Sequence, residues 1–312
     1  MILIISEEAD FSTNVVIDWL LYYNKKFVRI NLEDDLNISF NGSNIAFKSK
    51  NYSFNLEEIT SVWYRRGDLP IKYKETGDSK LDNFRIREIK KIKEYIHYKL
   101  CKVRHINSIL NVDYNKLIVS DIARTVGLLT PDDYIYDNVE SIKKDLSVTN
   151  KKYSTKSISG NFILQEEEHL YMGYTSILND FSMLNDFFFP SFIQNYISKN
   201  IELRVFYLDG NIWAMAIYSQ SDNKTNIDFR NYNFEKPNRT VPYELPESIK
   251  KKILKLMNEL KLNCGSLDLI LDSEDNYYFL EVNPVGQFGM VSNPCNYYLH
   301  KQIAKYLSFK NE

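Results

Sequence analysis

The segment Gly265-Ser-Leu-Asp-Leu-Ile-Leu-Asp-Ser-Glu-Asp-Asn-Tyr-Tyr-Phe-Leu-Glu-Val-Asn283 decides the fold of this chain. Apolar residues alternate with other residues over 265–271 and again over 277–283, and the polar run 272–276 between them has the composition of a turn. The pattern predicts a β-hairpin. If Asp272 pairs with Tyr277, Asp268 lies directly opposite Glu281 on one face of the hairpin.

Two acids that face each other across a strand pair repel, because their Cβ atoms are only about 5 Å apart. Asn283 shares the face of Glu281, since residues two apart on a strand point the same way. A divalent cation turns this repulsion into a binding site, and Mg²⁺ in nucleotide enzymes takes such oxygen ligands together with phosphate oxygens. The alternative is a solvated hairpin whose acids point to water. Apolar neighbours on both faces favour a buried hairpin instead.

Composition sets the class of protein. The chain has 312 residues, is 44% hydrophobic and 26% charged, and is therefore typical of a soluble protein with two or three domains. A net charge of −2 gives no global basic field for nucleic acid or an anionic membrane. Three widely spaced cysteines form neither a disulfide framework nor a zinc pattern, which favours a reducing cytoplasm. No apolar run reaches the ~20 residues that span a bilayer.

The N-terminal third has the pattern of a small α/β layer. A buried strand over 1–5, a helix over 10–23 and a strand over 26–32 predict a parallel β-α-β opening, followed by a meander of short strands over 37–60. Arg65 and Arg66 follow a strand over 62–64. A guanidinium pair there can bind phosphate or carboxylate, although exposed arginines with surface partners fit the pattern equally well. A long amphipathic helix over 81–101 is expected to bury Phe84, Ile86, Ile89, Ile92, Ile96 and Leu100.

The rest of the chain predicts two further parts. A helix within 113–131 ends at Gly127, ahead of Pro131, and strands are expected near 152–157 and 162–165. Strands over 202–208 and 212–218 flank the turn at Asp209-Gly210, and a helix over 246–260 precedes the 265–283 hairpin. We expect domains at 1–105, 106–200 and 201–312.

At Asp268 and Glu281-Val-Asn283 the sequence resembles the ATP-grasp ligases. Other pieces follow in that family's order: Asn115-Lys116 resembles the first nucleotide lysine and Lys156 the second, Phe192-Ile-Gln-Asn-Tyr-Ile-Ser-Lys199 resembles the hinge at adenine, and Glu202-Leu-Arg204 resembles the acid and arginine after it. Three more motifs resemble the ATP-grasp peptide maturases that make graspetides, and the last of them is most similar to the grasp-with-spasm branch. They are Trp63-Tyr-Arg-Arg66, Asp228-Phe-Arg230 and Asn283-Pro-Val-Gly-Gln-Phe-Gly-Met-Val-Ser-Asn-Pro-Cys-Asn-Tyr-Tyr-Leu299.

The resemblance implies an ATP-grasp fold, of α/β (α+β) class, behind an N-terminal α/β pre-ATP-grasp domain. It implies ATP and two Mg²⁺ ions as cofactors, with metal ligands Asp268, Glu281 and Asn283 and with nucleotide contacts from Lys116, Lys156, Gln194, Asn195, Tyr196, Lys199 and Glu202. Arg204 and Arg230 are the expected catalytic residues, and Arg65, Arg66 and Asp228 the expected substrate contacts.

The implied reaction is ATP-dependent activation of Asp or Glu side chains of a ribosomal precursor peptide as acyl phosphates. A hydroxyl or amine of the same peptide then closes an ester or amide ring. The implied partner is a precursor peptide with a leader, and the implied assembly is a cytoplasmic homodimer. One alternative is an ATP-grasp ligase that adds free amino acids to a protein tail or small metabolite, since fold alone does not separate these activities. Another is a nucleotide-binding regulatory protein, and a kinase is a third.

Overall fold

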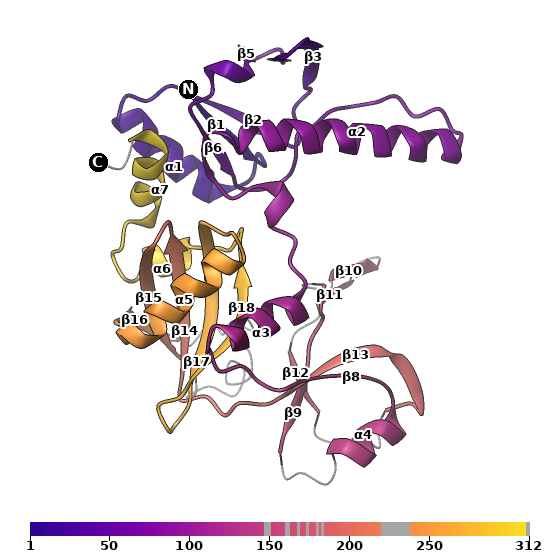
Figure 1. Cartoon of the computed structure of the whole chain (residues 1–312), viewed down its shortest axis with the longest axis vertical. Helices are drawn as coiled ribbons and strands as arrows, with labels where there is room; N and C mark the ends of the chain where they lie inside the picture. The colour runs from indigo at the N-terminus through magenta and orange to yellow at the C-terminus, as the bar shows by residue number, and fades with distance from the viewer. Residues whose placement is uncertain are drawn as a thin grey trace. The chain divides into compact units, whose positions relative to one another are not determined.

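The structure is a computed structural model, and it describes residues 1–146, 151–159, 163–166, 169–172, 175–178, 181, 184–219 and 238–309 (Figure 1). The chain divides into two compact units. Unit 1 comprises residues 1–113, 262–265 and 283–312, and unit 2 comprises residues 114–261 and 266–282. The expected division at 105 and 200 stays a prediction.

Unit 1 is built on a parallel sheet. Its strands, in the order β2-β1-β6-β7, are β2 (Phe27–Asn31), β1 (Ile2–Ser6), β6 (Ser61–Tyr64) and β7 (Arg104–Ile106), and each neighbouring pair is parallel. All five residues of β1 are buried, as a continuous apolar run in a covered parallel sheet requires. The helix α1 (Phe11–Tyr22) connects β1 to β2, and the side chain of Asp10 caps it by accepting from the Thr13 amide. The predicted β-α-β opening is therefore confirmed.

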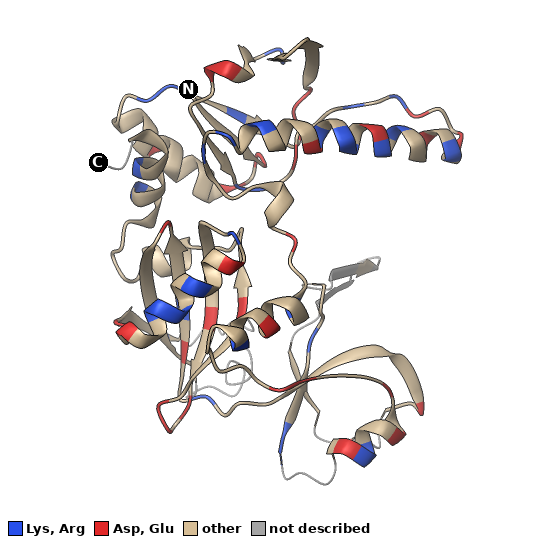
Figure 2. Cartoon of the chain, in the orientation of Figure 1, with Lys and Arg blue, Asp and Glu red and all other residues tan. Residues whose placement is uncertain are grey.

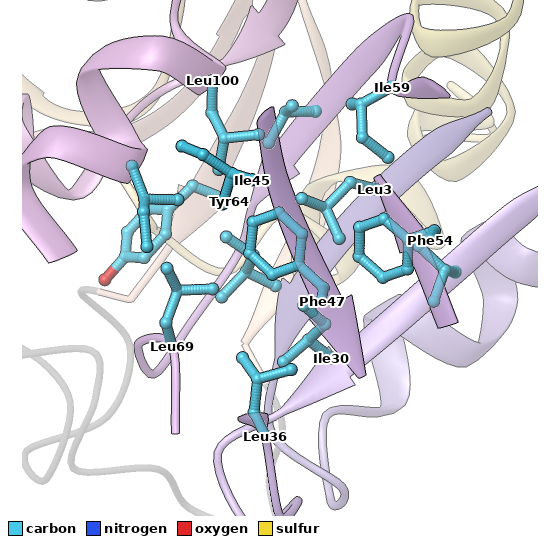
Figure 3. Packing of buried hydrophobic residues seen from close by; sticks show 14 residues of the cluster. Leu3, Ile30, Leu36, Ile45, Phe47, Phe54, Ile59, Tyr64, Leu69 and Leu100 are labelled. Carbon is cyan, nitrogen blue, oxygen red and sulfur yellow. The ribbon is translucent and has the colours of Figure 1, made fainter. Parts of the chain in front are cut away.

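A three-stranded antiparallel sheet in the same unit supplies much of its core. It consists of β3 (Asn37–Asn41), β4 (Asn44–Lys48) and β5 (Ser53–Asn55). Gly42 has φ of +61° in the tight turn between β3 and β4, a conformation that glycine adopts without steric cost. Figure 3 shows Phe47 and Phe54 beside Leu3 and Ile30, and the two phenylalanine rings stack with centroids 4.9 Å apart.

The helix α2 (Ser79–Leu100) is present as predicted, but the prediction that all its apolar residues are buried is wrong. Ile96 and Leu100 are buried, whereas Phe84 is 50%, Ile86 47% and Ile92 40% exposed. The N-terminal half of α2 extends past the sheet of unit 1 (Figure 1). There Ile86 and Ile89 line a pocket together with Ile71 and Tyr73.

The last helices of unit 1 are α6 (Gly289–Ser292) and α7 (Leu299–Ser308). The helix α7 packs against α1. It begins at Leu299, because Tyr298 has left-handed backbone geometry (φ +53°) and cannot lie within a right-handed helix. None of the helices in the described ranges is long and apolar enough to cross a bilayer.

Unit 2 contains two larger sheets. The first has the order β12-β9-β13-β8, with antiparallel neighbours β12 (Ser176–Leu178), β9 (Tyr153–Thr155), β13 (Phe187–Asn195) and β8 (Asp133–Asn138). The helix α4 (Val139–Leu146) contributes Ile142 and Leu146 to a small core under this sheet. A separate pair is formed by β10 (Ile163–Glu166) and β11 (His169–Met172).

The second sheet carries the hairpin segment 265–283. Its order is β16-β15-β14-β17-β18, with β16 (Arg239–Tyr243), β15 (Asn211–Tyr218), β14 (Ile201–Leu208), β17 (Cys264–Leu271) and β18 (Tyr277–Asn283). The helices α3 (Lys116–Thr125) and α5 (Glu247–Glu259) contact each other beside it. The turn at Asp209-Gly210 joins β14 to β15 with positive φ at both residues, as predicted for a two-residue hairpin turn.

Candidate functional site

Unit 2 contains a pocket whose walls come from both of its larger sheets and from the connection between β13 and β14. The residues that line it are Pro131, Ser154, Lys156, Thr175, Gln194, Asn195, Tyr196, Ile197, Lys199, Glu202, Leu203, Ile217, Asp268, Leu269, Ile270, Leu280 and Glu281. Most of the predicted nucleotide residues, together with the two predicted metal carboxylates, therefore lie around one cavity.

The two carboxylates of the predicted metal site stand on β17 and β18. Asp268 is ion-paired with Arg204 of β14, and Glu281 Oε2 lies 3.6 Å from Lys116 Nζ. The turn between the strands is one residue shorter than predicted, because the Asp272 amide donates to the Asn276 carbonyl and Asp272 does not pair with Tyr277. Both acids nevertheless line the same pocket.

Two lysines bring positive charge to these acids. Lys116 is the first residue of α3, after the cap residue Asn115, and its ammonium donates to the Ser157 carbonyl over 2.8 Å. Lys156 follows β9, and burial lowers its pKa, while the nearby carboxylates of Glu281, Asp133 and Asp268 oppose that shift. A lysine held in this way is a ready partner for an anion that enters the pocket.

The end of β13 and the connection after it present backbone to the cavity. The side-chain amide of Gln194 donates to Asp133 over 2.6 Å, and that of Asn195 donates to Asp132, so both side chains are turned toward β8. The amide of Tyr196 donates to the Lys152 carbonyl. The Oδ1 of Asn195 is buried and has no hydrogen-bond partner among the described residues. The adenine contacts that the resemblance assigns to this edge stay a prediction.

A buried ion pair stands beside this edge. Lys199 Nζ donates to Glu202 Oε1 over 2.5 Å, and the hydroxyl of Ser219 donates to the same oxygen. Burial raises the pKa of Glu202, whereas Lys199 and Ser219 favour its ionised form. Glu202 thus lies at the pocket wall, as expected of a residue that accepts hydrogen bonds from a ribose.

Sequence reasoning missed several parts of the pocket. Leu203, Ile217, Leu269 and Leu280 give it apolar walls, as a flat aromatic base requires. Each stands on a strand, and their strand periodicity alone was no signal for a ligand. Asp133 was missed too, and only the register that places it opposite Gln194 connects it with the site.

The comparisons with known proteins bear on this geometry. A family model for the RimK-like ATP-grasp domain matches residues 131–307, which is more than half of the chain. The chain belongs to the RimK-like ATP-grasp family. A model for the MvdD pre-ATP grasp domain matches residues 1–113. The predicted ATP-grasp fold with an N-terminal pre-ATP-grasp domain is therefore confirmed.

Solved structures agree with this assignment. The chain is similar to a RiPP-associated ATP-grasp ligase from Chryseobacterium gregarium, solved with ADP and a leader and core peptide (TM-score 0.82, 24% identity, 98% of this chain and 94% of that chain covered). It is also similar to macrocyclase MdnC from Microcystis aeruginosa, solved with precursor peptide MdnA (TM-score 0.79, 24% identity, 98% of this chain and 99% of that chain covered). A third similar structure is the ATP-grasp ligase PsnB, solved with a phosphomimetic variant of a minimal precursor, Mg and ADP. Its TM-score is 0.71 at 14% identity, with 98% of this chain and 97% of that chain covered. At these identities the likeness shows the fold. No curated protein matches the sequence.

The ATP-grasp pocket fits a nucleotide-bound Mg²⁺ better than a free-standing metal centre. Among the described residues, no group of three or more His, Cys, Asp or Glu side chains is placed to hold a metal ion. Asp268 and Glu281 supply two carboxylates, and Mg²⁺ is commonly bound by one or two carboxylates together with substrate phosphates and water. Asn283, the third predicted ligand, ends β18 two residues after Glu281. Its role stays a prediction.

The predicted substrate arginines lie in unit 1 of this ATP-grasp chain. Arg65 is only 3% exposed, and all three of its guanidinium nitrogens have partners: Asp10 and the carbonyls of Val285 and Gly286. Arg66 lies 3.1 Å from the same Asp10 carboxylate and is 37% exposed in its side chain. Of the two, only Arg66 is exposed enough to contact a substrate, because the guanidinium of Arg65 is bound within unit 1.

The remaining predicted site residues are Asp228 and Arg230. Both lie outside the described residues, so their places in the site stay predictions.

Proposed function

We propose that this chain is an ADP-forming ligase that closes side-chain ester or amide rings in a ribosomal precursor peptide. The observation that carries the proposal is the pocket of the RimK-like domain. It gathers Lys156, Asp268 and Glu281 against apolar walls, with Lys116 and Arg204 paired to the two acids. An apolar slot for a base beside cations and metal-binding carboxylates is the arrangement that ATP and Mg²⁺ need.

The peptide substrate is supported by the structural neighbours. The Chryseobacterium ligase was solved with a leader and core peptide, and MdnC with its precursor. In both comparisons, 98% of the present chain is covered. The match of residues 1–113 to the MvdD pre-ATP grasp domain extends the similarity across the N-terminal part. The proposed partner is accordingly a precursor peptide with a leader, while the homodimer and the cytoplasmic location stay predictions.

The proposed chemistry has two steps that balance. A carboxylate oxygen of an Asp or Glu side chain of the peptide attacks the γ-phosphorus of ATP, which gives an acyl phosphate and ADP. A hydroxyl or amine of the same peptide then attacks the acyl carbon, loses its proton and expels phosphate. Each ring therefore costs the peptide one water and consumes one ATP.

The chain's own residues position and neutralise the reactants in this scheme. Lys116 and Lys156 contact the phosphates, and the backbone from Gln194 to Tyr196 borders the adenine, with Lys199 behind it. Glu202 accepts from the ribose. Because the protein supplies no covalent step, catalysis rests on placement and on fixed charge.

The transferring group and the metal are assigned to the next residues along the chain. Arg204 and Arg230 hold the phosphoryl group and the acyl phosphate, where a planar guanidinium matches two oxygens at once. Asp268, Glu281 and Asn283 hold two Mg²⁺ ions, which supply charge that offsets the developing charge on the phosphates. Arg66 and Asp228 are the proposed peptide contacts.

Intact-mass measurement tests the proposal. A candidate precursor encoded beside this gene is incubated with the enzyme, ATP and Mg²⁺, and its mass is expected to fall by one water for each ring. Glu281→Gln is expected to abolish the loss. Glu274→Gln makes the same change at an exposed turn residue of the same hairpin and is expected to keep it.

Other masses point to other functions. Gain of an amino-acid residue indicates the amino-acid-adding ligase, and gain of a phosphoryl group indicates a kinase. An unchanged precursor together with no ATP binding contradicts any ATP-dependent enzyme and leaves no basis for the ring-forming function.

A further inference from the structure

Two buried side chains in unit 1 donate hydrogen bonds to the backbone that follows the predicted metal ligand Asn283. Arg65 comes directly after β6, and Asn107 comes directly after β7. These strands are parallel neighbours, with Trp63 opposite Ile106, so their following residues emerge at the same edge of the sheet. We call Arg65 and Asn107 the strand-end clamp.

The clamp donates hydrogen bonds to three successive backbone carbonyls. Asn107 Nδ2 donates to the Pro284 carbonyl over 2.6 Å, and Arg65 donates from one nitrogen to the carbonyls of Val285 at 2.8 Å and Gly286 at 3.4 Å. The carbonyl of Asn283 itself accepts from the Gly286 amide at 3.0 Å. Every backbone acceptor from Asn283 to Gly286 is therefore held.

The clamp also reaches the other strand of the hairpin. Asn107 Nδ2 donates to the Cys264 carbonyl at 3.1 Å, at the first residue of β17, and the Asn107 amide donates to the side chain of Asn263. One buried amide group thus joins the start of β17 to the residue that follows β18. This contact fixes the two ends of the hairpin against each other at its open end.

Both clamp residues are buried, and Arg65 has an ion-pair partner in Asp10. Arg65 is balanced by Asp10, whose carboxylate also accepts from the amide and the hydroxyl of Thr13 at the start of α1. Its guanidinium lies 5.5 Å from the centroid of the Phe288 ring. Asn107 is 6% exposed and has φ of +51°, a conformation that Asn tolerates better than most residues. The Oδ1 of Asn107 is buried and has no hydrogen-bond partner among the described residues, so the side chain is held through the nitrogen that donates to the two carbonyls.

We infer that the strand-end clamp is a positioning device for the Asn283 end of β18, and hence for the metal-binding oxygens of that strand. Side chains that orient metal ligands from behind typically alter metal affinity 10–100-fold when they are removed. The inference rests on the proposed function, because it takes Asn283 as a ligand of the nucleotide-bound Mg²⁺.

The test uses Asn107→Gly, which deletes the amide group and keeps a residue that accepts positive φ. Binding of a fluorescent N-methylanthraniloyl ADP is followed while MgCl₂ is titrated. The Mg²⁺ concentration for half-maximal binding is expected to rise about tenfold. Amide hydrogen exchange across residues 277–288, measured without nucleotide, is expected to become faster in the variant.

Asn24→Gly is the matched control. Asn24 has nearly the same backbone conformation (φ +53°), lies exposed in unit 1 and is subject to the same substitution. Its Mg²⁺ titration and its exchange across 277–288 are expected to equal those of the wild type. Arg65→Lys keeps the charge beside Asp10 and removes the guanidinium nitrogen that donates to the two carbonyls. It is expected to shift the Mg²⁺ titration in the same direction as Asn107→Gly.

The outcomes separate the two claims. If the wild type binds the ADP probe in a Mg²⁺-dependent way and folded Asn107→Gly shows an unchanged titration, the clamp does not position the metal strand. Faster exchange with an unchanged titration also overturns the inference, because the clamp is then structural only. If the wild type itself shows no Mg²⁺-dependent binding, the proposed function fails and the inference fails with it.

Discussion

Two clusters of charged side chains in this chain are similar in composition and differ in what surrounds them. In unit 1, Asp10 stands between Arg65 and Arg66, and its oxygens and the nitrogens of Arg65 all have partners within the unit. In unit 2, Asp268 and Glu281 line a pocket together with Lys156, and they are paired with Arg204 and Lys116. Figure 2 shows acidic residues on strands of the unit 2 sheet, whereas both signs alternate along α2.

The difference lies in the remaining capacity to bind. The Nε of Arg204 is buried and has no hydrogen-bond partner among the described residues, although another nitrogen of the same guanidinium meets Asp268. The Nε of Arg66 in unit 1 also makes no hydrogen bond within the described part of the chain, but it lies 3.1 Å from the carboxylate of Asp10. A buried donor without an acceptor carries a desolvation cost that an incoming anion relieves. The unit 1 cluster is therefore expected to contribute stability, and the unit 2 cluster to bind ligand.

The largest effect on activity is expected from a substitution in the unit 2 cluster. Glu281→Gln keeps the shape of the side chain and removes the charge that holds Mg²⁺ and faces Lys116. ADP formation with precursor peptide is expected to fall about 1000-fold or more, because catalysis in this scheme rests on charge placement. Its melting temperature is expected to stay near that of Glu274→Gln. A comparable loss of activity in Glu274→Gln would show that the hairpin, not the charge, was perturbed.

Breaking the unit 1 cluster is expected to cost stability. Asp10→Asn leaves Arg65 buried beside a neutral group, and removal of one partner from a buried pair costs about 3 kcal/mol or more of the free energy of unfolding. Denaturant unfolding measures this loss. Asp18→Asn makes the same change at an exposed position of α1 and is expected to alter stability by less than about 0.5 kcal/mol. Equal stability of the two variants would contradict the structural role.

The carboxylate of Asp10 is also expected to make the free energy of unfolding depend on pH in the acid range. Burial opposes ionisation of Asp10, but Arg65, Thr13 and Arg66 outweigh it and hold its pKa below the usual 3.8. A carboxylate whose pKa is lowered by folding stabilises the fold above its unfolded pKa, and this contribution is lost as pH falls through the folded value. Wild-type stability is thus expected to fall below pH 3.8 more steeply than that of Asp10→Asn, as urea unfolding at stepped pH would show.

A smaller effect is expected at Arg204. Arg204→Lys keeps a positive charge and loses the planar fork that meets Asp268 and a phosphoryl group at once. We expect a drop in kcat of about 10–100-fold with little change in the KM for ATP, since the interaction is made in the transition state. Arg239→Lys, on β16 of the same sheet, is the control. A drop confined to KM would place Arg204 at the ground-state nucleotide instead.

The smallest predicted effect is a shift in pH dependence. Because burial lowers the pKa of Lys156, its ammonium loses its proton at a lower pH than a free lysine does, and nucleotide affinity is expected to weaken there. Lys156→Arg keeps its charge and is expected to move this alkaline limb to higher pH by a measurable fraction of a unit. Lys152→Arg, at an exposed neighbour, is expected to leave the limb in place. Identical profiles for all three proteins would remove Lys156 from the phosphates.

How much of the fold was visible in the sequence depends on the range of the signal. The alternation in 265–283 and the apolar run of β1 are local patterns, and the structure contains both elements. The burial of Phe84 and Ile92 was predicted wrongly, because helical periodicity shows which residues share a face and not how far the neighbouring layer extends. The pairing of Asp272 was wrong by one residue, since turn length is set by backbone geometry at Asp275 (φ +63°).

The candidate site shows the same limit. Lys116, Lys156, Glu202 and the two strand acids were found through their order along the chain. Asp133 was not found, because its place beside the pocket depends on pairing with a strand more than fifty residues later. The carbonyl partners of Arg65, Val285 and Gly286, could not be predicted either, since they come from a loop at the other end of the chain.

The most direct test of the proposed function is the stoichiometry of one reaction. ADP release and the intact mass of the precursor are measured in the same sample over time, with wild-type enzyme, ATP and MgCl₂. The ring-closing mechanism predicts one ADP for each water lost from the peptide, and neither product without peptide. ADP release with an unchanged peptide mass, or with a peptide that keeps a phosphoryl group, would contradict it.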